Sequence, residues 1–171
     1  RAFVGAPKSH VLRMLEPGGF PALRWSLFCG EPLTEEIAGA WQRAAPSSAV
    51  ENLYGPTETT IACTAYRYRP EGSGAAAPHG IVPIGKPFGR SRTAVVDSAG
   101  APVADRQTGE LVIGGEQVAS GYWLDAERSA QAFRSMPLLQ PEGRWYRTGD
   151  LVALDASGDL MPDAFVEVVR W

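Results

Sequence analysis

The chain has 171 residues and a formal net charge of −3, and 44% of its residues are hydrophobic, which indicates a folded chain rather than a disordered one. Its 19 glycines and 14 prolines are typical of a protein with many turns and short strands, and they disfavour an all-helical fold. The acidic balance supplies no global positive field and no long apolar run is present, so we expect no nucleic-acid partner, no membrane partner and a cytoplasmic location.

The first half of the chain alternates helical and strand patterns. Apolar spacing predicts a short helix over Pro7–Leu15, followed by a strand over Leu23–Cys29. A helix capped by Thr34 is expected to run to about residue 45, and a second strand covers Ala49–Leu53. Strand, helix and strand within about 30 residues is the size of a βαβ unit with parallel strands. The β-branched and aromatic run Thr59–Tyr68 predicts one further strand.

The second half has a different pattern. Residues 70–78 show no periodicity and are expected to form an exposed, flexible connection. One helix is predicted near Asp125–Phe133, with Asp125 as its N-cap. Short strands are predicted at Thr93–Asp97, Glu110–Ile113, Leu151–Leu154 and Gly158–Met161. The predicted fold class is therefore α/β: a partial α/β subdomain over residues 1–70, a connection over 71–80, and an antiparallel, β-rich, barrel-like subdomain over 81–171.

The segment Asn52–Glu58 has the most unusual composition in the chain. It follows a predicted strand of the βαβ-like unit, and open α/β sheets bind ligands at such carboxyl ends. Its hydroxyls suit phosphate oxygens, its aromatic ring can stack on a base, and a carboxylate among phosphates suits Mg²⁺. On these residues alone, a polar turn in which Thr57 caps the chain is an equally good interpretation.

A second polar segment, Tyr146–Leu151, places Asp150 after a glycine turn at the start of a predicted strand. A fixed carboxylate can accept two hydrogen bonds from a vicinal diol such as a ribose. The alternative is an ordinary turn aspartate. The glycines of Gly109–Gly115 match neither a P-loop nor a dinucleotide fingerprint, so they are expected to be structural.

Taken together and in this order, the motifs resemble those of the adenylate-forming superfamily, specifically the amino-acid adenylation domains of nonribosomal peptide synthetases and their free-standing relatives. The matching segments are Asn52–Glu58 (NxYGPTE), Ile84–Pro87 (IGKP), Gly109–Leu111 with Val118–Tyr122 (GELxIxGxxVAxGY), and Tyr146–Leu151 (YRTGDL). The match runs from about residue 23 to residue 160. The resemblance implies the C-terminal part of an adenylate-forming large domain.

The resemblance also implies a reaction. An amino-acid carboxylate attacks the α-phosphate of Mg-ATP to give an aminoacyl-adenylate and pyrophosphate, and the acyl group then passes to the phosphopantetheine thiol of a partner carrier protein. The implied cofactors are ATP, Mg²⁺ and the carrier's phosphopantetheine. The implied substrate is an amino acid or a related carboxylic acid. Catalysis of this kind depends on positioning and on neutralising phosphate charge.

The matched motifs imply roles for individual residues. Thr57 would contact the phosphates and Glu58 would hold Mg²⁺, which makes these two the candidate catalytic residues and Glu58 the metal ligand. Tyr54 would flank the adenine, Asn52 would bond to its edge, and Asp150 would bind the ribose hydroxyls. The complete set expected to bind the nucleotide is Gly30, Glu31, Pro32, Asn52, Tyr54, Gly55 and Asp150.

The resemblance further implies a mostly apolar substrate pocket, lined by Leu27, Cys29, Leu53, Ile61 and Ala62. Such a pocket suits a small or apolar side chain because it discriminates by fit. Phe28–Glu31 also resembles ligases that activate D-alanine for carrier proteins. One further pocket position falls at Lys8 or Ser9, and a lysine there would favour an acidic substrate.

Parts of the family pattern have no counterpart in this chain. The glycine-rich triphosphate loop and the aspartate that binds the α-amino group belong upstream of the matched region. Downstream, Met161–Trp171 replaces the hinge pattern GRxDxQVKxRG, so no catalytic lysine or hinge arginine is assigned. Within the matched motifs, Glu110 and Tyr122 are expected to be structural.

Two functions of different classes follow. In the first, the parent protein is an amino-acid adenylating ligase and this chain alone is inactive. In the second, the chain is a truncated or decayed relative that serves only as a nucleotide-binding or protein-interaction module. The flanking coding sequence discriminates between them, because only the first requires the triphosphate loop and the lysine-bearing domain.

Overall fold

The structure is a computed structural model that describes residues 2–4, 15–70, 80–139 and 143–163. All of the predicted helix Pro7–Leu15 except Leu15, which is not helical, lies outside these ranges, as do the pocket position at Lys8 or Ser9 and most of the predicted connection. The segment beyond Asp163, where the hinge pattern was sought, also lies outside them.

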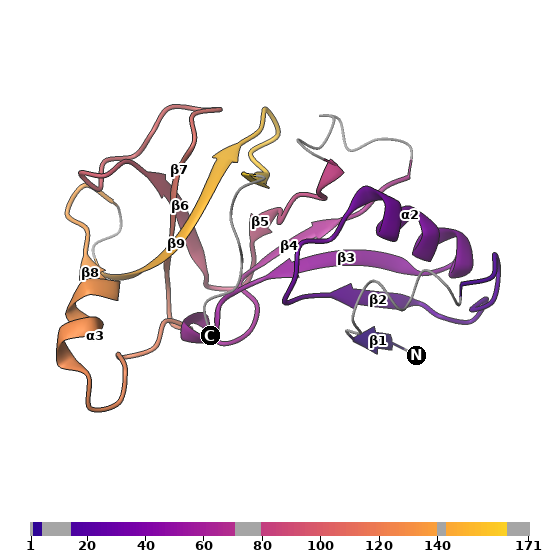
Figure 1. The fold of residues 1–171 in the computed structure, drawn as a ribbon, viewed down its shortest axis with the longest axis horizontal. Helices are drawn as coiled ribbons and strands as arrows, with labels where there is room; N and C mark the ends of the chain where they lie inside the picture. Colours follow the sequence, from indigo (N-terminus) through magenta and orange to yellow (C-terminus); the bar gives the residue numbers. More distant parts are fainter. Residues whose placement is uncertain (1, 5–14, 71–79, 140–142, 164–171) are drawn as a thin grey trace.

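The first sheet has five strands in the order β1-β2-β3-β4-β5 and occupies one end of the molecule (Figure 1). Strands β1, β2 and β3 pair in parallel, whereas β4 and β5 add to the sheet antiparallel. The strand bounds are β1 Ala2–Val4, β2 Trp25–Phe28, β3 Ala49–Tyr54, β4 Thr64–Arg67 and β5 Lys86–Pro87. The parallel β2–β3 pair with a helix between its strands confirms the predicted βαβ unit.

Helix α2 (Glu35–Ala44) joins β2 to β3 and covers one face of this sheet (Figure 1). Thr34 caps it as predicted, with Oγ1 accepting a hydrogen bond from the Ile37 amide at 3.3 Å. Ile37 is buried in the core between helix and sheet, which contributes roughly 1.5–3 kcal/mol relative to leaving it exposed. The Trp41 indole donates to the buried Ser26 hydroxyl at 2.6 Å, so the polar edge of the ring is also satisfied.

The predicted strand Thr59–Tyr68 is wrong in its first half. A 3₁₀ turn, η2 (Thr57–Thr59), comes first, and β4 begins only at Thr64. Between them Thr60 and Ile61 adopt positive φ angles of 61° and 74°, which a strand does not allow. Tertiary contacts override the strand propensity here: the Thr60 hydroxyl donates to the carbonyl of Gln117, 57 residues further along, at 3.0 Å.

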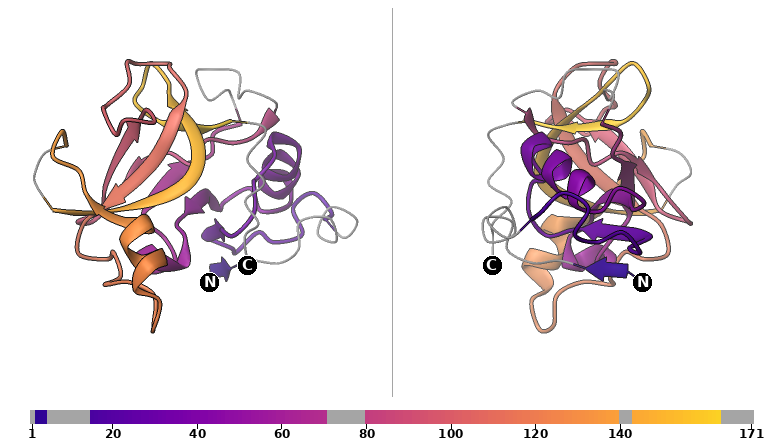
Figure 2. Two further views of the ribbon diagram at one scale, coloured as in Figure 1. Left: turned by 60° about the vertical axis from the view of Figure 1, so that its left-hand side comes forward. Right: turned by 90° about the vertical axis from the view of Figure 1, so that its right-hand side faces the viewer.

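The second sheet is antiparallel throughout, in the order β10-β9-β7-β6, with β8 also pairing with β9. It contains β6 (Arg92–Val96), β7 (Gly109–Gly114), β8 (Phe133–Ser135), β9 (Arg144–Leu154) and β10 (Leu160–Pro162). Figure 2 shows that its long strands curve, and the path is open at β6 and β10, so it forms a half-barrel. The antiparallel, barrel-like prediction is confirmed, but β9 begins seven residues before the predicted Leu151.

Helix α3 (Ala126–Ala132) leads into β8 and lies at the outer edge of this sheet (Figure 1). Asp125 is its N-cap, as predicted, and accepts a hydrogen bond from the Arg128 amide at 2.9 Å. None of its residues is buried. Within the described part of the chain, no helix has the length and apolarity needed to cross a membrane.

The two sheets share a hydrophobic core. Cys63 and Ile84, from the first half, pack with Leu111, Val152 and other residues of the half-barrel. Burial raises the pKa of the Cys63 thiol to about 11, so the thiol stays protonated at neutral pH. Ile84 and Gly85 also exchange backbone hydrogen bonds of 2.9 Å with Leu160 of β10. The two sheets are therefore held at a common junction.

Candidate functional site

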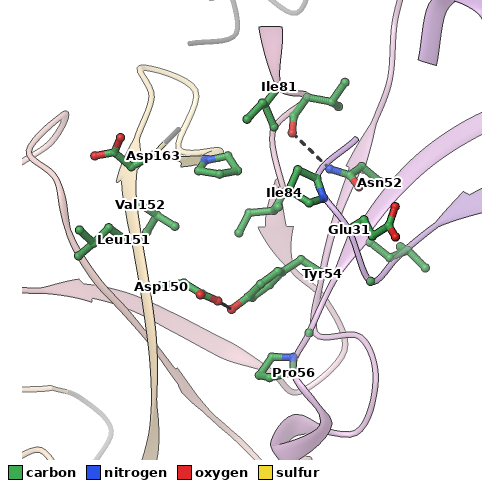
Figure 3. Close-up of a pocket in the computed structure, with 16 residues that line it drawn as sticks. Glu31, Asn52, Tyr54, Pro56, Ile81, Ile84, Asp150, Leu151, Val152 and Asp163 are labelled. Carbon is green, nitrogen blue, oxygen red and sulfur yellow. Dashed lines mark hydrogen bonds between the residues drawn. The ribbon is translucent and has the colours of Figure 1, made fainter. Parts of the chain in front are cut away.

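A pocket lies at this junction and is lined by residues from both sheets (Figure 3). All seven residues predicted to bind the nucleotide line it: Gly30, Glu31, Pro32, Asn52, Tyr54, Gly55 and Asp150. The structure thus brings together three segments that are far apart in sequence. The prediction missed other lining residues, namely Pro56, Ile81, Val82, Ile84, Leu151, Val152, Pro162 and Asp163. The apolar members of this set carried no signal beyond a general strand pattern.

Tyr54 and Asp150 meet across the pocket although 96 residues separate them. Figure 3 shows the Tyr54 ring extending from the end of β3 so that its hydroxyl donates a hydrogen bond to Asp150 Oδ2 on β9. Burial, and then the Asp150 charge, raise the pKa of Tyr54 well above its usual value, so the phenol stays protonated. Burial also raises the pKa of Asp150, while the hydrogen bond from Tyr54 lowers it.

A break in the β7–β9 ladder positions Asp150. Gly149 has a φ of 78°, and the strand register shifts beside it between Glu110 and Val112. The Thr148 hydroxyl accepts from the Asp150 amide at 3.0 Å, and the Gly149 amide donates to Glu110 Oε1 at 3.2 Å. The predicted glycine turn at the start of a strand is therefore wrong: the turn is a bulge inside the continuous strand β9, because the ladder resumes on both sides of it.

Glu110 is structural in the way the sequence predicts. Its Oε2 accepts hydrogen bonds from the Arg147 guanidinium, and the pair spans β7 and β9 next to the bulge. These hydrogen bonds raise the pKa of Arg147. The polar residues of the segment Tyr146–Leu151 are thus held by partners on other parts of the fold: Arg147 by Glu110, Thr148 by the Leu111 carbonyl and Asp150 by Tyr54.

Asn52 is buried in β3, where its side-chain amide is oriented by two backbone carbonyls, and Figure 3 shows one of the two hydrogen bonds. Its Nδ2 donates to the Val82 oxygen at 3.2 Å and to the Pro83 oxygen at 2.8 Å. Both partners are acceptors, so the amide nitrogen must face them and the amide oxygen remains for a ligand. A contact between Asn52 and a base would then use this oxygen as an acceptor.

The two predicted catalytic residues lie on η2 and outside the pocket lining. Thr57 is exposed, while Glu58 is half-buried and accepts a hydrogen bond from the Tyr122 hydroxyl at 2.7 Å. Burial and the hydrogen bond to Glu58 raise the pKa of Tyr122. Burial and a hydrogen bond with Tyr122 likewise raise the pKa of Tyr146. Sequence reasoning assigned Tyr122 a structural role, and the only signal for more was its place in the Val118–Tyr122 motif.

Among the described residues, no group of three or more histidine, cysteine, aspartate or glutamate side chains could hold a metal ion. Glu58 alone therefore cannot form a complete protein cage. Mg²⁺ in nucleotide sites is usually held by one or two carboxylates together with substrate phosphates and waters. A single half-buried carboxylate fits this kind of shared site.

Of the five predicted substrate-pocket residues, only Leu53 lines the pocket described above. Leu27 and Leu53 alternate with residues that face α2, so both lie on the opposite face of the sheet. The Cys29 thiol approaches the carbonyl of Ile61 at 3.7 Å, which places the strand end beside the loop that carries Ile61 and Ala62. The Ile61 side chain is 73% exposed. Among the described residues, Leu53 therefore links this predicted set to the pocket, while Cys29 contacts the loop that follows η2.

Comparisons with known proteins agree with one another. Residues 3–123 match the family described as AMP-binding enzyme. The D-alanine--D-alanyl carrier protein ligase of Lactiplantibacillus plantarum is 35% identical over 91% of this chain and 30% of its own length.

Two solved structures are similar throughout the described fold. The Vibrio cholerae adenylation domain AlmE, in complex with glycyl-adenosine-5'-phosphate, is 32% identical with a TM-score of 0.79, covering 95% of this chain and 30% of that one. PA1221, an NRPS protein containing adenylation and PCP domains, is 26% identical with a TM-score of 0.82, covering 95% of this chain and 32% of that one. The chain therefore spans about a third of the length of these proteins.

Proposed function

Because the chain belongs to the AMP-binding enzyme family, we propose that it supplies nucleotide-binding residues to an ATP-dependent ligase that activates an amino acid or a related carboxylic acid. The carboxylate of the acid attacks the α-phosphorus of ATP. The bond between this phosphorus and the oxygen that bridges to the β-phosphate breaks, and pyrophosphate leaves. The acyl-adenylate then passes its acyl group to the phosphopantetheine thiol of a carrier protein, and AMP leaves.

The observation that carries the proposal is the meeting of Tyr54 and Asp150 across one pocket. An aromatic ring next to a carboxylate suits a nucleoside, because the ring can flank the base while the carboxylate accepts from the ribose hydroxyls. The Asn52 amide oxygen, left over by its two backbone partners, accepts from an exocyclic amine of the base. The pocket lies where the two proposed units, residues 1–70 and 81–171, meet.

Glu58 is the proposed ligand for Mg²⁺, and Thr57, exposed at the start of η2, is the proposed contact to the phosphates. When bound, Mg²⁺ neutralises phosphate charge as the pyrophosphate bond breaks. The two residues sit on one short turn directly after Tyr54 and Gly55, so base and phosphate contacts come from consecutive positions of one loop. Gly55 is required there because a Cβ would lie 2.7 Å from the Ala62 Cα.

The names of the similar proteins support an amino-acid substrate and a carrier-protein partner. One acts on D-alanine and a D-alanyl carrier protein, and one was solved with a glycyl-adenylate. The apolar residues Leu27, Cys29 and Leu53, proposed to line the substrate pocket, suit a small or apolar substrate side chain. The use of ATP supports a cytoplasmic location.

Substrate-dependent ATP–pyrophosphate exchange tests the proposal. We expect the natural full-length protein to exchange label with one or a few small or apolar amino acids from a panel that includes D- and β-forms. The 171-residue chain alone is expected to be inactive. A natural protein that binds ATP but exchanges no label with any acid would contradict the ligase function and favour a nucleotide-binding module.

A further inference from the structure

Residues of the segment 117–122 hydrogen-bond to the turn that carries Glu58. The Ala119 amide donates to the Glu58 carbonyl at 2.8 Å, and the Gln117 carbonyl accepts from the Thr60 hydroxyl at 3.0 Å. The third contact is the hydrogen bond of 2.7 Å from the Tyr122 hydroxyl to Glu58 Oε1. Both the backbone and the carboxylate of Glu58 are therefore held from the same segment.

Tyr122 is in turn held on several sides. Its amide donates to the Ser129 hydroxyl at 2.8 Å, the Arg128 guanidinium lies 4.4 Å from the centre of its ring, and Phe133 contacts the ring edge-on at 5.4 Å. Gly121 has no room for a Cβ, which would lie 2.8 Å from the Ser129 Oγ. Helix α3 buries none of its own residues, and two of its side chains, Arg128 and Ser129, contact Tyr122.

A phenol is suited to orient a metal-binding carboxylate. It donates one hydrogen bond and carries no charge, so the carboxylate keeps its full attraction for a cation. An ionised carboxylate has about four lone-pair positions, so the hydrogen bond from Tyr122 and the interaction with the neighbouring Tyr146 hydroxyl still leave others available. No lysine or arginine forms an ion pair with Glu58 among the described residues.

We propose that Tyr122 is a positioning residue: through its hydrogen bond to Oε1 it fixes the Glu58 carboxylate in the orientation that binds the divalent cation accompanying ATP. The inference rests on the proposed function, in which Glu58 is the metal ligand. It assigns a role to α3 as well, because this helix supplies the side chains that hold the Tyr122 ring.

The test separates the hydroxyl from the ring. Tyr122→Phe, prepared in the natural full-length protein, keeps the ring and its contacts with Arg128 and Phe133 but removes the hydrogen bond. The affinity for Mn²⁺ in the protein–ATP complex is measured by electron paramagnetic resonance, with Mn²⁺ in place of Mg²⁺. We expect the apparent Kd for Mn²⁺ to rise about tenfold, the magnitude typical for loss of a residue that orients a metal ligand.

Kinetics give a second readout. The exchange rate of Tyr122→Phe should recover as Mg²⁺ is raised, while the KM for the amino acid stays unchanged. In a double-mutant cycle, Glu58→Gln should weaken Mn²⁺ binding more than Tyr122→Phe, and adding Tyr122→Phe to Glu58→Gln should cause no further loss, since the tyrosine acts through Glu58. Tyr68→Phe is the matched control, because it removes a tyrosine hydroxyl in the core between α2 and the first sheet. It should change neither the Mn²⁺ affinity nor the exchange rate.

Each outcome decides the inference. Unchanged Mn²⁺ affinity in Tyr122→Phe, a loss that added Mg²⁺ does not restore, or additive effects in the cycle would each overturn it while leaving the proposed function in place. A wild-type protein that binds no Mn²⁺–ATP would instead overturn the proposed function, and the inference with it.

Discussion

The two sheets contribute to the pocket in different ways. In the mixed sheet, Tyr54 is the last residue of β3, and the residues after it leave the strand for the turn η2. In the half-barrel, Asp150 lies inside β9, with paired residues before and after it. The same pocket therefore receives one polar group from the end of a strand and the other from its middle.

The difference shows what each architecture requires. Residues that follow a strand end no longer belong to the ladder, so a loop can turn toward a ligand with only a glycine at the closest approach, which here is Gly55. A side chain inside a ladder can change its direction only if the ladder is interrupted. In β9 this takes Gly149 at positive φ and the Thr148 hydroxyl as a substitute partner for the Asp150 amide.

The largest expected effect is a loss of stability at the junction between the two sheets. Gly85 has a φ of 76°, and a Cβ there would lie 2.0 Å from the Ala65 carbonyl oxygen. Gly85→Ala should lower the free energy of unfolding by about 3 kcal/mol or more, because backbone strain and a clash with backbone combine. Urea denaturation of the natural protein measures the change.

Gly100→Ala is the matched control for this substitution. Gly100 has a similar φ of 82° but nothing within 4 Å of a Cβ, so only the conformational cost of about 1 kcal/mol remains. Equal losses in the two variants would show that crowding at the joint does not matter and that the sheets are less tightly coupled than the shared core indicates.

The next effect tests the pocket from the half-barrel side. Asp150→Asn should weaken ATP binding about 10- to 100-fold while leaving the fold intact, since a charged acceptor for the ribose hydroxyls is lost. Isothermal titration calorimetry gives the affinity. Asp155→Asn is the control, because Asp155 is a turn aspartate that accepts from the Ser157 and Asp159 amides. If both variants bind ATP like the wild type, Asp150 is an ordinary strand residue.

The smallest effect tests the pocket from the mixed-sheet side. The hydrogen bond from Tyr54 lowers the pKa of Asp150, so Tyr54→Phe should raise that pKa. Only the ionised carboxylate accepts from both ribose hydroxyls, so ATP affinity falls as pH drops through this pKa. In Tyr54→Phe the fall should begin at a higher pH than in the wild type, whereas the ring still flanks the base. Affinity measured across pH 4–8 reports the shift, and superimposable profiles would contradict it.

Much of the fold was predictable from local signals. Thr34 and Asp125 cap the helices that they were expected to cap, because a side-chain acceptor one residue before a helix satisfies a first-turn amide. The parallel β2–β3 pair follows from its length and pattern. The loop Thr59–Cys63 was not predictable, because its β-branched residues favour a strand while tertiary contacts, among them those with Gln117, hold it in another shape.

The candidate site also has a part that could be predicted from the sequence and a part that could not. The family resemblance selected all seven nucleotide-side residues that the pocket brings together, and their roles remain predictions. The partners of those residues were invisible in the sequence: the Val82 and Pro83 carbonyls that orient Asn52, and the Tyr122 hydroxyl on Glu58. A backbone carbonyl has no residue-type signature, and a tyrosine 64 positions away carries no local mark of its contact.

The sequence by itself indicated the family, the βαβ unit, the antiparallel second half and seven of the residues that line the pocket. The βαβ unit and the antiparallel half follow from residue type and spacing, which short-range physics can interpret, whereas the family and the seven residues follow from the resemblance of the motifs. Only the tertiary structure decided that Asp150 emerges from a bulge, that Tyr54 reaches it, and that α3 holds Tyr122 against Glu58. These arrangements arise from contacts between segments tens of residues apart, where register and packing, rather than local propensity, set the position of each side chain.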